Sequence, residues 1–587
     1  MPSGLRSFAT RCLGPWVQTL DAATWRSDLL AGLMGALLVL PQGVAFAALV
    51  GVPPAMGLAT AVLPCAVAAL AGSSRQMLTG PTNATSLALG AMLLPLAGGQ
   101  PQQLMALAIL VTLLVGAMQL GLALARLGTL ANFISPSVML GFTTGAAALI
   151  GWYAIAAMLG AAGRETPPEV LRNGLAWPPL AVGGLTLVLA FLVRKMGGQR
   201  LAMPLALVGG ALLNAWLEAQ GHPALRLGTP PSAAGHWQLP ALDAAVLPQL
   251  LPQLLPMALA LTIIALGQSM AVAKLLAART GQQLDANREC RGQGLANLIG
   301  ALGGCFVACG SLNRSLPNLE AGARTPVAGV SAALWLLLLV ALAGPLLAWI
   351  PLAGVGALLL LTAASLIEPA VWRRLWRRDR REAGIALATL AATLVLRLEV
   401  AVLAGVMLSL VAYLHRTSRP AMRTMGFDSQ SHHRPFVVLD DAGIEALPEC
   451  PQLKLLRMEG SVWFGAVPYV ADQLRQLREQ PQRHLLVMSK SMNFIDLAAA
   501  DLWDDERVNR REIGGDLYFH RPRPPVLATW QTTGFLSRLG SDHVFADKRS
   551  AIAHIVPLLD DRICARCPVR LFEECSERPG APLSPMI

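Results

Sequence analysis

The feature that most constrains this chain is a series of long apolar runs without a single charged residue. A helix needs about 20 apolar residues to cross a bilayer, so each run holds two helices, or one helix and one broken helix. Charged residues make up 14% of the 587 residues, whereas soluble domains average about 25%. The runs therefore predict an α-helical polytopic membrane protein. They are Leu29–Ser74, Gln76–Ala125, Leu127–Gly163, Ala244–Ala273 and Thr325–Ile367.

The distribution of Arg and Lys supports a count of fourteen apolar segments, because cytoplasmic loops of membrane proteins are enriched in these residues. Basic residues fall mainly after even-numbered segments, and six Arg lie between Arg373 and Arg381. This alternation predicts a multi-pass protein of the cytoplasmic membrane with both termini, including the N-terminal segment 1–28, in the cytoplasm. The fourteen segments are 29–50, 54–71, 81–97, 104–125, 136–160, 177–194, 202–217, 247–275, 292–308, 313–323, 327–345, 352–370, 383–397 and 400–415.

Two pieces broken by Gly and Pro, Gly72–Gly90 and Gly304–Pro326, overlap the third and tenth segments. Fourteen segments divide into two sets of seven, and an odd number of crossings gives the sets opposite orientations, so an inverted repeat is predicted. The two pieces then occupy equivalent positions. Non-helical backbone at membrane depth must line a cavity or be buried in protein. Such a pair of interrupted segments points to the binding site of a transporter.

The residues of the two pieces favour a small anion as ligand. Each broken helix would turn its N-terminus toward one cavity, with free N–H groups and about half a positive charge. The side chains of four polar residues in these pieces add further donors. The predicted site residues at the breaks are Thr82, Asn83, Ala84, Ser311, Leu312, Asn313 and Arg314.

Arg314 would add a full positive charge beside the second break. By insertion scales an Arg at the bilayer centre costs about 2.5–3.5 kcal/mol, so it is expected to be functional or paired. The alternative is that Arg314 pairs with Glu320 or extends toward the cytoplasm. In the first segment, Gln42 and Phe46 lie one helical turn apart and share a face. Phe46 is interpreted as a wall of the cavity or, alternatively, as plain core packing.

The composition changes after Pro420. Apolar runs shorten to the length of strands, at 435–439, 453–458, 484–488 and 516–520. Amphipathic stretches, among them Val467–Arg478 and Leu497–Arg511, lie between them. This alternation predicts a small cytoplasmic α/β domain.

Four motifs, in order along nearly the whole chain, resemble those of the sulfate-permease-type (SulP) anion transporters with a C-terminal STAS domain. The resemblance implies a seven-plus-seven inverted repeat, in which core segments 1–4 and 8–11 carry the substrate past gate segments 5–7 and 12–14. It also implies an elevator-like alternating-access mechanism and a homodimer, and it places Gln42 and Phe46 on the face that lines the site. The motifs are Pro41–Leu58, Gly72–Ser86, Asp285–Cys305 and Ser311–Pro326.

The eighth segment departs from the pattern of that family. Many members have a Glu at the position of Gln268, in the stretch GQSMAVAK over 267–274. A Gln does not titrate, so neither proton coupling nor a carboxylate sodium site is expected there. Gln268 still belongs to the predicted substrate site, and transport is expected to be exchange, facilitated flux or coupled elsewhere.

The resemblance divides the chain into a transmembrane domain over 29–416 and a STAS-like domain over 435–557. In stand-alone STAS relatives a phosphorylatable Ser follows an Asp at a helix start, whereas here Leu497 follows Asp496. A phosphorylation switch is therefore not expected. The domain is predicted to stabilise a dimer or, alternatively, to bind a cytoplasmic protein partner.

A Cys-containing tail over 558–587 follows the STAS-like domain. Its Cys564, Cys567 and Cys575 are weak candidates for metal or redox chemistry, because zinc or a cluster needs a fourth ligand. Cys450, a His or a second subunit are the alternatives for that ligand, and inert reduced thiols are the simpler interpretation. No cofactor is expected.

The leading prediction is a secondary active or facilitative transporter of a small inorganic or carboxylate anion. Sulfate, bicarbonate, chloride and dicarboxylates all suit N–H donors and one Arg. Two alternatives stay open: a membrane-anchored anion sensor or scaffold that acts through the STAS-like domain, and a nucleobase permease of the same fold. A nucleobase permease predicts carboxylates in segments 8 and 10, where this chain has Gln268 and Arg314.

Enzymes and nucleic-acid-binding proteins are not expected. The sequence contains no Ser/His/Cys triad and no membrane-embedded metal motif. The net charge of +11 comes from basic residues in short loops between segments. Asp285, Asn287 and Glu289 lack the Gly and the distal Glu of a calcium loop, so they are interpreted as a helix-capping cluster.

Overall fold

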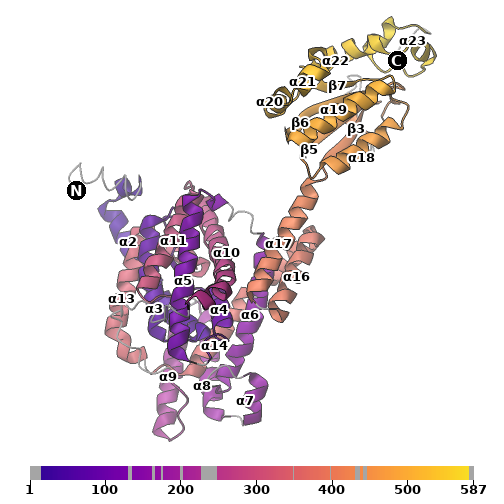
Figure 1. The fold of residues 1–587 in the computed structure, drawn as a ribbon. Coiled ribbons are helices and arrows are strands. Elements are labelled where there is room, and N and C mark those ends of the chain that lie inside the picture. Colours follow the sequence, from indigo (N-terminus) through magenta and orange to yellow (C-terminus); the bar gives the residue numbers. More distant parts are fainter. Residues whose placement is uncertain are drawn as a thin grey trace. The chain divides into compact units, whose positions relative to one another are not determined.

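The chain divides into two compact units, Met1–Ser409 and Leu410–Ile587, which are described separately (Figure 1). The division falls inside the last apolar segment, slightly before the predicted end of the transmembrane domain. Both chain ends, and with them the predicted cytoplasmic placement of the termini, lie outside the described residues. The computed structural model describes residues 15–98, 100–129, 135–161, 166–173, 176–197, 202–226, 247–347, 349–396, 398–429, 436–439 and 446–580.

The first unit is helical, and every predicted segment has a helix as its counterpart. Among the described residues, eight helices are long and apolar enough to cross a membrane, and three shorter apolar helices accompany them. The number of crossings itself stays a prediction. The helices are α2 (Ala22–Val50), α3 (Pro54–Ala71), α4 (Asn83–Leu93), α5 (Pro101–Leu124), α6 (Pro136–Met158), α7 (Pro167–Asn173), α8 (Trp177–Lys195), α9 (Ala202–Ala219), α10 (Leu247–Thr280), α11 (Ala286–Leu302), α12 (Leu312–Glu320), α13 (Val327–Leu347), α14 (Leu352–Leu366), α15 (Pro369–Arg378), α16 (Arg380–Val395) and α17 (Leu398–Thr417).

The helices of the first unit pack in two groups. In one group α11 lies against α3 and α5, α13 lies against α2 and α3, and α10 lies against α5. In the other, α6 packs on α14 and α16, and α8 packs on α9 and α14. The helices of the first group belong to predicted core segments and those of the second to predicted gate segments, and the division into core and gate stays a prediction. A sliding movement of one group against the other stays a prediction.

Local sequence signals set several helix ends. The Asp21 side chain accepts a hydrogen bond of 2.7 Å from the Thr24 N–H and so caps α2. The same helix ends at Gly51, whose φ of 87° requires a residue without a side chain. Pro stands in the first turn of α3, α5 and α6, where its missing N–H costs nothing.

One predicted loop is a helix instead. The basic stretch from Arg373 lies mostly in α15, which begins at Pro369 and has no buried residue. Its Arg side chains face outward while two Trp occupy other positions of the same short helix. The run of Arg led to the prediction of a loop, because basic residues are typical of the cytoplasmic ends of membrane-spanning segments. Basic residues also occur in amphipathic helices at the membrane surface, so they do not distinguish such a helix from a loop.

The second unit is an α/β domain built on a six-stranded sheet of order β4-β3-β5-β6-β7-β8. Strand β3 pairs antiparallel with β4 and β5, whereas β5 to β8 are parallel. The four predicted strands and the two amphipathic helices are present; β3 and β8 were not predicted. The strands are β3 (Ala421–Phe427), β4 (Phe436–Val438), β5 (Leu453–Val462), β6 (His484–Ile495), β7 (Leu517–His520) and β8 (Val544–Phe545).

Helices connect the parallel strands and supply the core on one side of the sheet. Trp503 of α19 and Trp530 of α20 are fully buried, and both pack against Phe519 of β7, with ring centroids 5.2 and 4.5 Å away. The helices of this unit are α18 (Val467–Arg478), α19 (Leu497–Glu512), α20 (Pro524–Thr532), α21 (Phe535–Leu539), α22 (Lys548–Ile555) and α23 (Asp561–Arg566).

A buried ion pair on α19 offers a test of this core. Arg510 binds Glu506 at 2.7 Å and also donates to the carbonyl of Gln482 at 2.9 Å, and both charged side chains are buried. We expect Arg510→Ala to destabilise the second unit by about 1–3 kcal/mol, because the buried Glu506 keeps only Arg478 as a partner and the Gln482 carbonyl loses its donor. Hydrogen exchange of α19 and β6 amides in the full-length protein measures the loss.

The matched control is Arg507→Ala on the same helix. Arg507 pairs with Asp504 at 2.8 Å, and Asp504 keeps a second partner in Arg538. The expected cost is about 0.2–1 kcal/mol. Equal protection losses in the two variants would contradict the structural role assigned to Arg510.

Candidate functional site

The two broken segments meet in space as a short antiparallel strand pair. Strand β1 (Thr79–Gly80) pairs with β2 (Cys309–Gly310), so that Thr79 lies opposite Gly310 and Gly80 opposite Cys309. Helix α4 follows β1, and α12 follows β2. The break in each half of the chain is therefore held by hydrogen bonds to the break in the other half. This pairing brings the starts of α4 and α12 to the same place.

The first turns of α4 and α12 leave backbone N–H groups without partners. Thr82 caps α4 through its hydroxyl, which accepts from the Thr85 N–H. Among the described residues, no hydrogen-bond acceptor is found for the N–H groups of Asn83 and Ala84 in α4, or of Leu312 and Asn313 in α12. Unpaired N–H groups at helix N-termini are suited to an anion.

The side chains at the two starts differ in exposure. Asn83 is buried, and its amide oxygen has no partner in the described part of the chain. Leu312 and Asn313 are exposed. Ser311 is buried, but its N–H already donates to the Leu78 carbonyl at 3.1 Å. The backbone N–H of Ser311 therefore completes the strand pair, as expected for the residue that precedes the helix.

Arg314 is buried to 1% exposure and braces the first break. Its Nη2 donates to the Pro81 carbonyl at 2.9 Å, and its guanidinium lies against Gly80, where an added Cβ would meet Nη1 at 2.6 Å. No carboxylate among the described residues pairs with Arg314, and Glu320 is exposed. The alternative of an Arg314–Glu320 pair is therefore wrong. The charge stays uncompensated at the meeting point of the two halves.

Gln268 of α10 connects the two breaks. Its amide oxygen accepts from the Thr82 hydroxyl at 3.1 Å and from the Cys309 thiol at 3.1 Å. Cys309 is fully buried, and its sulfur lies 3.3 Å from the Thr82 hydroxyl. The next residue of α10, Ser269, accepts from the Gly310 N–H at 2.9 Å. The structure thus brings Gln268 together with residues of both broken segments.

The two predicted residues of α2 are placed differently. Phe46 is buried at 6% exposure in an apolar cluster that also contains Ala84 and Cys309. Gln42 is half-buried, and its side chain makes no hydrogen bond to the described residues. Phe46 therefore packs in the core beside residues of both breaks, while the Gln42 amide is left without a protein partner.

Sequence reasoning missed the residues of α11 that hold the breaks in place. Asn297 binds both backbone groups of Ala308, accepting from its N–H at 2.8 Å and donating to its carbonyl at 3.0 Å. Gln293 donates to the Thr79 hydroxyl at 3.0 Å. These contacts join residues far apart in the chain, and a lone Asn or Gln within an apolar segment is the signal that points to them.

Glu289 is not a helix cap, although Asp285 is. The Asp285 side chain accepts from the N–H groups of Asn287 and Arg288 at the start of α11. Glu289 is buried and accepts from the N–H groups of Ser73 and Ser74 at 2.8 and 2.9 Å. Its carboxylate thus holds the chain that leads into β1. The acidic cluster divides into one cap and one long-range anchor.

The third group of candidates lies in the second unit. Three half-buried cysteines there, Cys564, Cys567 and Cys575, line a pocket together with Cys450. All four are far in sequence from the two helix breaks.

The paired breaks, the two helix N-termini and the buried Arg define a polytopic membrane protein with a transporter's binding-site architecture. The model of the Sulfate permease family matches residues 25–389, and that of the STAS domain matches residues 445–551. The chain belongs to the Sulfate permease family and carries a C-terminal STAS domain. The family matches are transporters, not enzymes.

Similar proteins cover nearly the whole chain. A probable sulfate transporter of Mycobacterium tuberculosis is 29% identical over 543 residues, which are 90% of this chain and 94% of that protein. The chloroplastic sulfate transporter 4.1 of Arabidopsis thaliana is 29% identical over 576 residues, covering 92% and 81%. Among solved structures, SLC26A9 has a TM-score of 0.82 at 18% identity and covers 95% of this chain and 94% of its own.

The transmembrane part also has a solved counterpart. The transmembrane domain of the cyanobacterial bicarbonate transporter BicA matches with a TM-score of 0.57 and 22% identity, over 67% of this chain and 98% of its own. These likenesses show the fold. The predicted membrane-transporter fold with a STAS domain is confirmed.

The close approach of Arg314 to Gly80 gives a test of the site. Because a Cβ at position 80 would displace the guanidinium, we expect Gly80→Ala to lower anion uptake by about ten- to a hundredfold, the effect of losing one charged hydrogen bond. Uptake into proteoliposomes measures this. The control is Gly121→Ala, since a Cβ at Gly121 meets nothing within 4 Å. Unchanged uptake by Gly80→Ala would show that the Arg314 position is unimportant.

Proposed function

We propose that this protein carries a small inorganic or carboxylate anion across the cytoplasmic membrane, with the anion held between the N-termini of α4 and α12 near Arg314. The observation that carries the proposal is the pairing of β1 with β2. It gathers four unpartnered N–H groups and one uncompensated buried charge at a single place. Such a place attracts negative charge, and none of the described carboxylates pairs with Arg314 there.

The proposed roles of the site residues follow from their positions. The N–H groups of Asn83, Ala84, Leu312 and Asn313 donate to the anion, and Arg314 supplies charge from behind the first break. Gln268 and Thr82 hold each other and orient the start of α4. The remaining predicted residues complete the cavity, with Gln42 as a further donor, Phe46 as an apolar wall, and Ser311 at the start of α12.

The named substrates of similar proteins narrow the anion class. Relatives at 29% identity are described as sulfate transporters, and a solved structure of similar fold is described as a bicarbonate transporter. Sulfate is the first anion to test, and bicarbonate, chloride and dicarboxylates are the competitors. Each of these fits a site of backbone donors with one Arg, and size and charge would then select among them.

Alternating access is the proposed mechanism. The group that contains α2–α5 and α10–α13 carries the site, and the group of α6, α8, α9, α14, α16 and α17 is the gate against which it slides. Contacts within each group are more extensive than those between them. A homodimer that the STAS domain stabilises, and cytoplasmic termini, complete the proposal. Both rest on the resemblance to the family.

The central test is uptake of labelled anion into proteoliposomes loaded with sulfate, bicarbonate, chloride or a dicarboxylate. We expect counterflow of one anion, which falls about tenfold or more in Arg314→Ala because the site loses its positive charge. Arg324→Ala is the matched control, since this exposed Arg lies after the end of α12, outside the site. Anion binding without flux of any anion would overturn the transporter proposal and favour a sensor.

A second test concerns coupling. Because Gln268 does not titrate, we expect no proton coupling through this position, so any dependence of uptake on a proton gradient should survive in Gln268→Met. Gln268→Glu introduces a carboxylate beside the N-termini, so uptake should fall at neutral pH and recover as pH falls toward the ordinary Glu pKa of about 4.3. Gln268→Met removes the same amide without adding charge and should show no such recovery. Proton-driven uptake that only Gln268→Met abolishes would contradict this expectation.

A further inference from the structure

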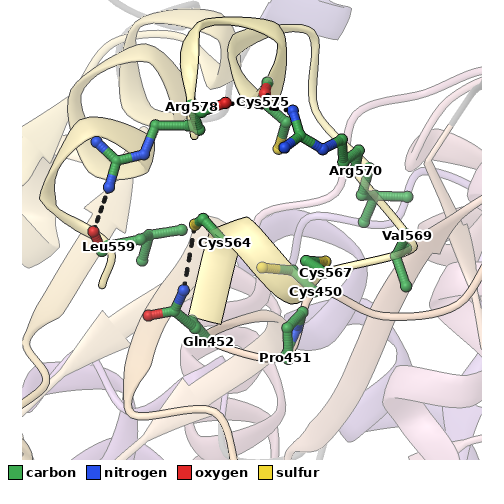
Figure 2. Close-up of a pocket in the computed structure, with 11 residues that line it drawn as sticks. Cys450, Pro451, Gln452, Leu559, Cys564, Cys567, Val569, Arg570, Cys575 and Arg578 are labelled. Carbon is green, nitrogen blue, oxygen red and sulfur yellow. Dashed lines mark hydrogen bonds between the residues drawn. The ribbon is translucent and has the colours of Figure 1, made fainter. Parts of the chain in front are cut away.

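Four cysteines from distant parts of the second unit line one pocket (Figure 2). Cys450 precedes β5, Cys564 lies in α23, Cys567 follows that helix, and Cys575 lies in the short 3-10 helix Glu573–Glu577. The pocket has about 360 Å³ of empty space, counting the part open to solvent. More than a hundred residues separate the first cysteine from the other three, so the fold itself assembles this set.

Hydrogen bonds hold the cysteine-bearing segments together at the pocket. Gln452 donates from its amide nitrogen to the Cys564 sulfur at 3.3 Å (Figure 2). The same nitrogen donates to the Asp560 carbonyl at 3.1 Å, and the Gln452 amide oxygen accepts from the Asp560 N–H at 2.8 Å. N–H groups directed at sulfur stabilise the thiolate form, which is the form that binds metals.

The surroundings of the sulfurs favour a bound cation in a second way. Four thiolates in this pocket would repel one another, and a metal removes that cost. Arg570 and Arg578 line the same pocket (Figure 2). Their charges suit a centre that stays negative after four thiolates have bound a metal.

We propose that these four cysteines bind a thiophilic metal centre. Four Cys ligands are the set used by structural zinc and by iron–sulfur clusters, and the C-x2-C spacing of Cys564 and Cys567 occurs in both. In the described part of the chain, no three His, Cys, Asp or Glu side chains already lie close enough to hold a single ion. The sulfurs instead surround a hollow. An iron–sulfur cluster, which spans such a hollow, is therefore the expected occupant.

Two simpler interpretations compete with this proposal. The cysteines are unpaired in the structure, so the described residues contain no disulfide that would explain their gathering. Inert thiols would not need the hydrogen bond that Gln452 donates to the Cys564 sulfur, because a buried thiol behaves as a small apolar side chain. A reversible Cys564–Cys567 disulfide would leave Cys450 and Cys575 without a role. The proposed centre accounts for all four.

The test uses the full-length protein, purified without oxygen through a tag that contains no histidine. Iron, acid-labile sulfide and zinc are counted per chain, and free thiols are titrated. We expect about one cluster per chain with visible absorption. Zinc at one ion per chain without iron would support the same ligands around a single ion. Metal-free protein with four accessible thiols, or with a disulfide, would overturn the proposal.

Variants separate a built site from adventitious metal. Cys450→Ser and Cys564→Ser should each lower bound metal at least about tenfold, whereas Cys305→Ser, a buried thiol of the first unit, should not. Gln452→Ala keeps all four ligands and should weaken retention against a chelator about ten- to a hundredfold. Elution as the native species and retained anion uptake show that a variant is folded. Equal metal in the wild type and all variants would overturn the proposal.

Discussion

The pairing of β1 with β2 is the constraint on which the rest of the first unit depends. Each strand has only two residues, so an isolated pair of this length would be unstable in water. Within an apolar surrounding the balance differs, because an unpaired backbone N–H or carbonyl has no water to bind and costs several kcal/mol. The backbone groups of each break therefore form hydrogen bonds with those of the other break. The interruption that weakens each helix alone becomes the contact that joins the halves.

Polar side chains of helix α11 hold the two paired breaks in place. Asn297 satisfies both backbone groups of Ala308, just before β2, while Gln293 reaches Thr79 in β1. Glu289, one turn earlier, binds the chain that leads into β1. These three positions follow one another at intervals of four residues, so they lie along one face of the helix. A single polar stripe therefore positions both breaks, and the starts of α4 and α12 follow from it.

The sequence was sufficient for the segments and for the location of the breaks, because both depend on local composition. Uncharged runs identify helices, and Gly/Pro interruptions identify the broken ones. Contacts between residues that lie far apart in the chain could not be predicted from the sequence. Glu289 was interpreted as a cap since Asp285 nearby has the residue type and position of one, and only the fold brings Ser73 and Ser74 to its carboxylate. Strand β8 was not predicted, because a strand of two residues is too short to show a periodic pattern. Cys309 looked like one apolar residue among many.

The charges buried in the first unit support the proposal of an anion site. Among the described residues of that unit, the buried charged side chains are Asp28, Glu289 and Arg314. Both carboxylates are satisfied internally: Asp28 accepts from the N–H of Arg324 at 2.7 Å and from the hydroxyl of Thr325 at 2.5 Å, and Glu289 accepts from two N–H groups. Hydrogen bonds of this kind replace hydration for a carboxylate. Arg314 has a single carbonyl as partner, and a carbonyl does not neutralise a cation. Arg314 is thus a buried positive charge without a counterion among the described residues, and the helix N-termini beside it also favour negative charge, which supports the proposed anion site.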